Sequence, residues 1–222
     1  MYFTTHLLII ILNKTQKNGL KREAIARPTE YSHSEVANLT KQQPMKHNRN
    51  GQAEILKEEQ LEELLNTFVP KHKLLFAICY YTSCRISEAL KLERSDFISD
   101  RIIFRAATTK TKRTREVKIP QKLAQIIEEV GLPAKGYLFP SPSGNGHMTR
   151  QAADKALRHA ADYIGLQGVS THSFRRTGIT KLHDAGIPLR TLQQRTGHAS
   201  LANLALYVEV NQADIDAAGE LL

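Results

Sequence analysis

The chain has 222 residues, with 31 Lys and Arg against 22 Asp and Glu, a formal net charge of +9 and a pI of about 9.6. This balance favours a polyanionic partner, with nucleic acid first, because Lys and Arg side chains that bind phosphates release condensed counterions. Two cysteines are too few for a disulfide framework and lack the spacing of a zinc site, and the apolar patch Leu7 to Leu12 is too short to span a membrane. We therefore expect a cytoplasmic protein that acts on DNA and has no membrane partner.

Residues 1–54 carry mixed charge, Asn, Gln and Ser around that one apolar patch, and they show no sustained helical period. Two interpretations stay open: a flexible, poorly ordered leader, or an extension that precedes a true start at Met45. From Ile55 onward apolar residues recur regularly. We expect one folded domain over residues 55–222.

The first part of this domain has a helical pattern. Apolar residues at helical spacing predict a helix over residues 55–68, which Pro70 ends, and a second, mostly apolar helix over 71–81. The segment 82–90 predicts a turn into a third helix that carries Arg85. The three together indicate a helical core.

A short β-structure follows. Residues 101–105 are β-branched and aromatic, and they are expected to pair with residues 116–119 across a turn at 108–115. Helices are predicted at 121–130 and 149–164, with Thr149 as the N-cap of the latter and a Pro, Ser and Gly loop at 140–146 between them. The expected fold class is mainly α with a small antiparallel β-sheet.

The stretch 171–207 contains four groups suited to phosphate chemistry. His172 and Arg175 stand three residues apart, so on a helix they share a face. Gly197 precedes His198, and Tyr207 follows nine positions after that histidine (207 minus 198). An imidazole, a guanidinium and a phenol can therefore reach one cleft.

Two earlier segments complete the pattern. Thr82, Arg85 and Glu88 form the motif Thr-x-x-Arg-x-x-Glu, and Glu88 at i+3 can hold the guanidinium of Arg85. Further on, Lys110 lies in a basic hairpin tip. With these five motifs in this order and at these spacings, the chain from about Ile55 to its end resembles the catalytic domain of the tyrosine recombinase (phage integrase) family.

The resemblance implies a role for each of these residues. Cleavage of a DNA strand places extra negative charge on phosphate oxygens, and fixed cationic and hydrogen-bonding groups lower that barrier. By the family pattern these groups are Arg85, Arg175 and His198, with Glu88 in support, and Tyr207 is the nucleophile that forms a 3′-phosphotyrosyl link. Lys110 is the expected general acid, with Lys112 as its competitor, and His172 is the best-placed base. No metal or cofactor is expected.

The implied partner is double-stranded DNA, bound by a homotetramer. The residues expected to contact DNA are Lys112, Arg113, Arg115 and Arg176. The family's N-terminal core-binding domain has no counterpart in the leader, so an accessory DNA-binding factor is a further expected partner. The terminal segment 211–222, with an apolar stripe at Ile215, Ala218, Leu221 and Leu222, predicts either packing within the chain or exchange between protomers.

The sequence departs from the family pattern at two positions in these motifs. Ser83 stands where the family usually has Gly, and a positive φ there would cost on the order of 1 to 2 kcal/mol. Thr196 replaces the usual Leu before Gly197-His198, which predicts a small loss of packing. Two alternatives to recombination stay open: a non-catalytic DNA-binding remnant or regulator, and strand relaxation by a type IB topoisomerase.

Overall fold

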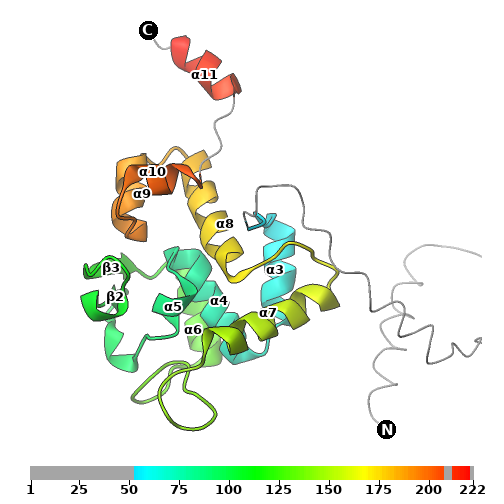
Figure 1. Ribbon diagram of the computed structural model, residues 1–222, viewed down its shortest axis with the longest axis vertical. Helices are drawn as coiled ribbons and strands as arrows, with labels where there is room; N and C mark the ends of the chain where they lie inside the picture. Colours follow the sequence, from blue (N-terminus) through cyan, green and yellow to red (C-terminus); the bar gives the residue numbers. More distant parts are fainter. Residues whose placement is uncertain (1–52, 208–211, 221–222) are drawn as a thin grey trace, which may run out of the picture. The chain divides into compact units, whose positions relative to one another are not determined.

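The computed structural model describes residues 53–207 and 212–220 (Figure 1). In chain order its helices and strands are α3 (Glu58–Thr67), α4 (Pro70–Thr82), α5 (Ile86–Ala89), β1 (Phe97–Ile98), β2 (Arg101–Phe104), β3 (Arg115–Lys118), α6 (Gln121–Val130), α7 (Arg150–Tyr163), α8 (Thr171–Asp184), α9 (Leu189–Thr196), α10 (Leu201–Ala205) and α11 (Gln212–Gly219). The expectation of a mainly helical fold with a small antiparallel sheet is confirmed. Among these helices none is long and apolar enough to cross a bilayer.

Three sequence expectations fall wholly or partly outside the described ranges. The leader that the sequence predicts to be flexible covers residues 1–54, of which only the last two are described, and the alternative start at Met45 lies outside as well. Leu221 and Leu222 of the apolar stripe also lie outside, whereas Ile215 and Ala218 of α11 are exposed to solvent.

Helix α4 is the centre of the domain. Every side chain from Leu74 to Tyr80 is buried, as expected for a helix that is apolar on all sides. It packs against α3, α6 and α8 (Figure 1). Phe76 stacks between Phe68 and Phe174, with ring centroids 4.7 Å apart on both sides, so aromatic contacts join the start, middle and end of the domain.

A glycine lets α8 approach α4 closely. A Cβ at Gly178 would lie 2.5 Å from the carbonyl oxygen of Tyr80 and 3.0 Å from Oγ of Ser83. A larger residue would push α8 away from the end of α4. The approach matters because α8 carries His172 and Arg175, and the turn after α4 leads to Arg85.

The sheet has the order β1-β2-β3 and is antiparallel throughout. Ile102 pairs with Val117, and both are buried, whereas the paired residues Ile103 and Glu116 alternate to the other face. The predicted pairing of residues 101–105 with 116–119 is confirmed, and the connection between the two strands begins with a short 3-10 turn over Ala106–Thr108.

Two helix predictions agree closely with the structure, and a third does not. The helix predicted at 121–130 is α6, and α7 begins after Thr149, whose hydroxyl accepts a hydrogen bond from the amide of Ala152 at 3.1 Å. The predicted third helix is only the four-residue α5, and Arg85 is its extended N-cap rather than a residue within it. The reason is Ser83, whose left-handed φ of 50° turns the chain between α4 and α5.

Candidate active site

A buried carboxylate holds two arginines at one side of the candidate site. Glu88 is 2% exposed. Its Oε1 accepts from Nη1 of Arg85 at 2.9 Å, and its Oε2 accepts from Nη2 of Arg115 at 2.8 Å. Arg115 lies over the ring of Phe104 at 3.9 Å, which fixes its plane. Burial lowers the pKa of Arg115, and the carboxylate of Glu88 opposes this shift.

Arg175 is the most deeply buried cation of the site, with 1% of its surface exposed. Its Nη1 donates to the carbonyl oxygen of Ser83 at 2.7 Å, and its Nη2 donates to the carbonyl oxygen of Thr196 at 3.2 Å. Burial, followed by the charge of Arg85, lowers the pKa of Arg175 to about 10. The guanidinium therefore stays protonated at neutral pH, and its two backbone anchors aim it from α8 across the ends of α4 and α9.

His198 lies against this guanidinium. Nη2 of Arg175 is 2.9 Å from Nε2 of His198, and the ring is 7% exposed. Burial, followed by the charges of Arg175, Arg85 and Arg115, lowers the pKa of His198 to about 3. His198 is consequently a neutral imidazole at pH 7.

The glycine before His198 meets two requirements, one of backbone conformation and one of packing. Gly197 ends α9 in the left-handed region with a φ of 69°, which glycine adopts without a steric penalty. A Cβ at this position would also lie 3.0 Å from Nε of Arg115. Gln193 also fixes the backbone at His198, because its Nε2 donates to the carbonyl oxygen of His198 at 3.2 Å.

His172 begins the same helix that carries Arg175. Ser170 caps this helix and accepts from the amide of His172 at 3.3 Å, while the imidazole is exposed. Loss of hydration lowers the pKa of His172, and the charges of Arg150, Arg175 and Arg85 lower it further. The ring therefore lies within the field of both arginines and is poised to accept a proton at neutral pH.

Tyr207 follows α10 and faces the same histidine. The ring centroids of Tyr207 and His198 are 5.2 Å apart. The carbonyl oxygen of Tyr207 accepts from Oγ1 of Thr180 at 3.1 Å, and its half-buried ring packs on a small core of Ile179, Leu192 and Leu204. The phenol is therefore held at the site from two sides.

The hairpin tip supplies exposed cations beside the arginines. Lys110 and Lys112 are exposed, and within the described part of the chain Lys110 makes no hydrogen bond or ion pair. Arg113 lines a groove of about 330 Å³ together with Arg190 and His198. The tip thus borders the site and leaves its lysines free to meet an anionic ligand.

The sequence matches the model of the phage integrase family over residues 54–214. The chain belongs to the phage integrase family. It is 32% identical over 160 residues to a protein of Sinorhizobium fredii named as an integrase/recombinase, y4qK, a match that covers 70% of this chain and 52% of the relative. It is also 26% identical over 208 residues to the tyrosine recombinase XerD of Halalkalibacterium halodurans, covering 87% of this chain and 66% of that protein.

Solved structures of recombinases share the fold. The XerA recombinase superposes with a TM-score of 0.63 at 21% identity, over 79% of this chain and 65% of that one. The catalytic domain of bacteriophage HP1 integrase gives a TM-score of 0.56 at 24% identity, over 70% of this chain and 87% of that one. The chain spans about half the length of the first curated relatives it matches.

Two residues of the predicted DNA-contacting set of this integrase-family chain have partners within the domain. Arg176 is 4% exposed and donates from Nη1 to the carbonyl oxygen of Ala53 at 3.0 Å, so its side chain stabilises the start of the domain. Arg115 is committed to Glu88 beneath the site. Lys112 and Arg113 remain exposed, as a DNA contact requires.

The contact between Thr196 and His198 in this integrase-family site was not predicted from the sequence. The sequence predicted a loss of packing there, yet the side chain is fully buried and its Oγ1 lies 2.7 Å from Nδ1 of His198. A polar residue two positions before the histidine was the available signal. At position 83 the φ is 50°, so the condition under which a Ser there carries a backbone cost is met.

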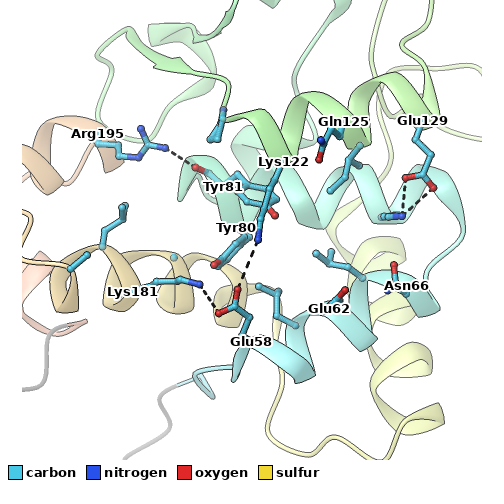
Figure 2. Close-up of a pocket in the computed structure, with 18 residues that line it drawn as sticks. Glu58, Glu62, Asn66, Tyr80, Tyr81, Lys122, Gln125, Glu129, Lys181 and Arg195 are labelled. Atoms are coloured by element: carbon cyan, nitrogen blue, oxygen red, sulfur yellow. Dashed lines mark hydrogen bonds and ion pairs between the residues drawn. The ribbon is translucent and has the colours of Figure 1, made fainter.

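A separate cavity of about 700 Å³ lies among α3, α4, α6 and α8 and contains none of the predicted catalytic residues (Figure 2). Glu58 stands at its edge and pairs with Lys181 at 3.0 Å and Lys122 at 4.0 Å. Arg195, also on its wall, donates to the carbonyl oxygen of Tyr81 at 2.7 Å. Two lysines thus neutralise Glu58, and the backbone of α4 holds Arg195.

Proposed function

We propose that this member of the phage integrase family is a site-specific recombinase that cuts and rejoins double-stranded DNA through a 3′-phosphotyrosyl intermediate. The observation that carries the proposal is the contact chain from Tyr207 through His198 to Arg175. A phenol next to a buried guanidinium suits phosphoryl transfer. The XerH recombinase, a structural relative with a TM-score of 0.61 and 22% identity, is described as bound to its difH substrate, which supports DNA as the partner.

Two guanidinium groups supply the positive charge in this mechanism. Arg175 and Arg85 approach from different elements. The guanidinium of Arg85, of which only Nη1 is bound to Glu88, can donate two parallel hydrogen bonds to a phosphate, and Arg175 adds a buried positive charge. Their charge is fixed before DNA binds, which is the arrangement that stabilises developing charge most effectively. We propose on this basis that the reaction requires no metal ion or other cofactor.

The proton transfers fall to the remaining groups. The phenol of Tyr207 attacks phosphorus and loses its proton to His172, whose lowered pKa keeps it neutral at pH 7. The 5′-oxygen that leaves takes a proton from Lys110, with Lys112 as the competing acid. His198 packs against the guanidinium of Arg175 and helps to hold it at the phosphate. Attack by a 5′-hydroxyl on the phosphotyrosyl bond then rejoins the strand and releases Tyr207.

Assembly and location follow from the same reaction. Recombination joins four strand ends, so we propose a homotetramer on DNA in the cytoplasm, with an accessory DNA-binding factor that supplies contacts beyond this domain. The exposed Ile215 and Ala218 of α11 support exchange of the terminal segment between protomers. Removal of residues 213–222 should abolish the tetrameric band in a gel-shift assay while the monomer complex persists. An unchanged tetramer would contradict the exchange.

The decisive experiment traps the covalent intermediate. Nicked duplexes from the DNA that flanks the gene lose a short 5′-hydroxyl fragment after cleavage, so the adduct accumulates and survives SDS. We expect an adduct with the wild type and with Tyr163→Phe, a control that removes the hydroxyl of an exposed tyrosine on α7. Tyr207→Phe should give none.

The outcome also separates the alternatives. DNA binding without any adduct would overturn the catalytic proposal in favour of a non-catalytic binder. Efficient relaxation of a supercoiled plasmid that lacks a recombination site would instead identify topoisomerase activity. None of the similarities or contacts described above favours either alternative.

A further inference from the structure

The buried hydroxyl of Thr196 has two close polar neighbours. Its Oγ1 lies 2.7 Å from the carbonyl oxygen of Leu192, one turn earlier in α9, and 2.7 Å from Nδ1 of His198. The side chain is fully buried, so water does not compete for either contact. Both contacts must therefore be satisfied by the single hydroxyl.

The number of protons decides the direction of each bond. A threonine hydroxyl has one proton to donate and two lone pairs, and a carbonyl oxygen can only accept. The hydroxyl proton therefore points to Leu192, the common i to i−4 bond of a helical threonine. Oγ1 is left as an acceptor, and Nδ1 of His198 must carry the proton that it accepts.

The contact with Arg175 is compatible with the same state. Arg175 can only donate, and its Nη2 lies 2.9 Å from Nε2 and 3.3 Å from Nδ1 of His198. A position this close to both nitrogens lies over the face of the ring, so it leaves the in-plane Nδ1–H free to point at Thr196. A neutral imidazole with its proton on Nδ1 satisfies all partners.

We propose that Thr196 is a positioning residue that fixes His198 in the Nδ1–H tautomer and holds its ring against the guanidinium of Arg175. The carbonyl oxygen of Thr196 also accepts from Arg175 at 3.2 Å, so one residue orients both groups. Without the hydroxyl, the neutral ring is free to hold its proton on Nε2. The catalytic consequence rests on the proposed recombinase function, whereas the tautomer does not.

The test compares Thr196→Val, which keeps the shape and removes the hydroxyl, with Thr196→Ser, which keeps the hydroxyl. In the ¹⁵N-labelled full chain at pH 7, imidazole correlations identify the protonated nitrogen of His198, assigned with His198→Asn. We expect Nδ1–H in the wild type and the Ser variant, and a gain of Nε2–H in the Val variant. A wild type with Nε2–H, or a Val variant that keeps only Nδ1–H, would overturn the proposal.

Cleavage of the nicked duplex gives a second readout. We expect the Val variant to cleave roughly 10- to 100-fold more slowly, the usual effect of losing a group that orients an active-site histidine, and the Ser variant to stay near wild type. Equal losses in both variants would reduce Thr196 to a packing role. If the Val variant does not fold, Thr196→Ala repeats both measurements. A chain that cleaves no DNA at all would refute the recombinase function and leave the tautomer result standing.

Discussion

Glu88 holds Arg115 with 2.8 Å between Oε2 and Nη2, although the two residues lie 27 positions apart. The same carboxylate binds Arg85 through its other oxygen, so α5 and β3 are joined beneath one predicted catalytic cation. Both partners of the first pair are nearly buried, at 2% and 9% exposure. The position of Arg85 therefore depends on a buried charge rather than on its own short helix.

Replacement of this carboxylate should be costly. We expect Glu88→Gln to lower the free energy of unfolding by roughly 3 kcal/mol, because it leaves a buried guanidinium without its counterion. The matched control is Glu129→Gln, whose carboxylate is exposed and pairs with Lys73, and which should change stability by less than about 1 kcal/mol. Urea unfolding measures both, and similar values for the two variants would contradict the assigned role.

Ser83 tests the strain in the turn before Arg85. Its φ is 50°, and its Oγ is fully buried with no hydrogen-bond partner among the described residues. Ser83→Ala removes the unpaired hydroxyl and keeps the strain, whereas Ser83→Gly removes both. We expect the Gly variant to be more stable than the Ala variant by about 1 kcal/mol, as for relief of a left-handed backbone. Thermal unfolding that ranks Ala above Gly would show that the strain is absent.

The role of Lys110 as the general acid can be tested by changing the leaving atom of the substrate. If Lys110 protonates the 5′-oxygen, Lys110→Ala should slow cleavage by about 100-fold or more. A substrate with sulfur in place of that oxygen releases a thiolate, which needs no proton to leave. This substrate should therefore restore the cleavage rate of the Lys110→Ala variant. Lys112→Ala is the control on the same hairpin tip and should cleave the oxygen substrate at close to the wild-type rate. Rescue of the Lys112 variant instead would assign the acid to Lys112.

The lowered pKa of His198 predicts how the free energy of unfolding changes at acid pH. Its pKa is about 3 in the folded chain, against an ordinary value of 6.5. Between these values the unfolded chain binds the proton and the folded chain does not, so stability falls as pH drops below 6.5, by at most about 1.4 kcal/mol per pH unit. Above pH 6.5 the group contributes no pH dependence.

The variant that isolates this effect is His198→Asn, which keeps a donor for Thr196 and cannot titrate. Urea unfolding at pH 7 and pH 5 should show a smaller loss for the Asn variant than for the wild type. Other histidines with lowered pKa, His72 and His172, are present in both proteins and cancel in the comparison. An equal acid loss in both would mean that His198 titrates normally.

The sequence by itself determined the family pattern and the position of several helices. The spacings among Arg85, Arg175, His198 and Tyr207 identified that pattern, and apolar periodicity placed α6 at its observed bounds. The Ser at position 83, where the family usually has Gly, marked a place where a positive φ would be costly, and its φ is 50°. These features are local, because helical spacing, capping and backbone sterics act over a few residues.

Only the tertiary structure decided the partners of each group. Arg115 and Arg176 look alike in sequence as basic residues near catalytic motifs, yet one pairs with Glu88 and the other binds the carbonyl oxygen of Ala53. Thr196 looked like a packing defect, and it proves to be the hydrogen-bond partner of His198. The direction of a long side chain, and the state of a buried proton, depend on which distant segments share the site, and packing of α4 against α8 and of β3 against α9 settles that.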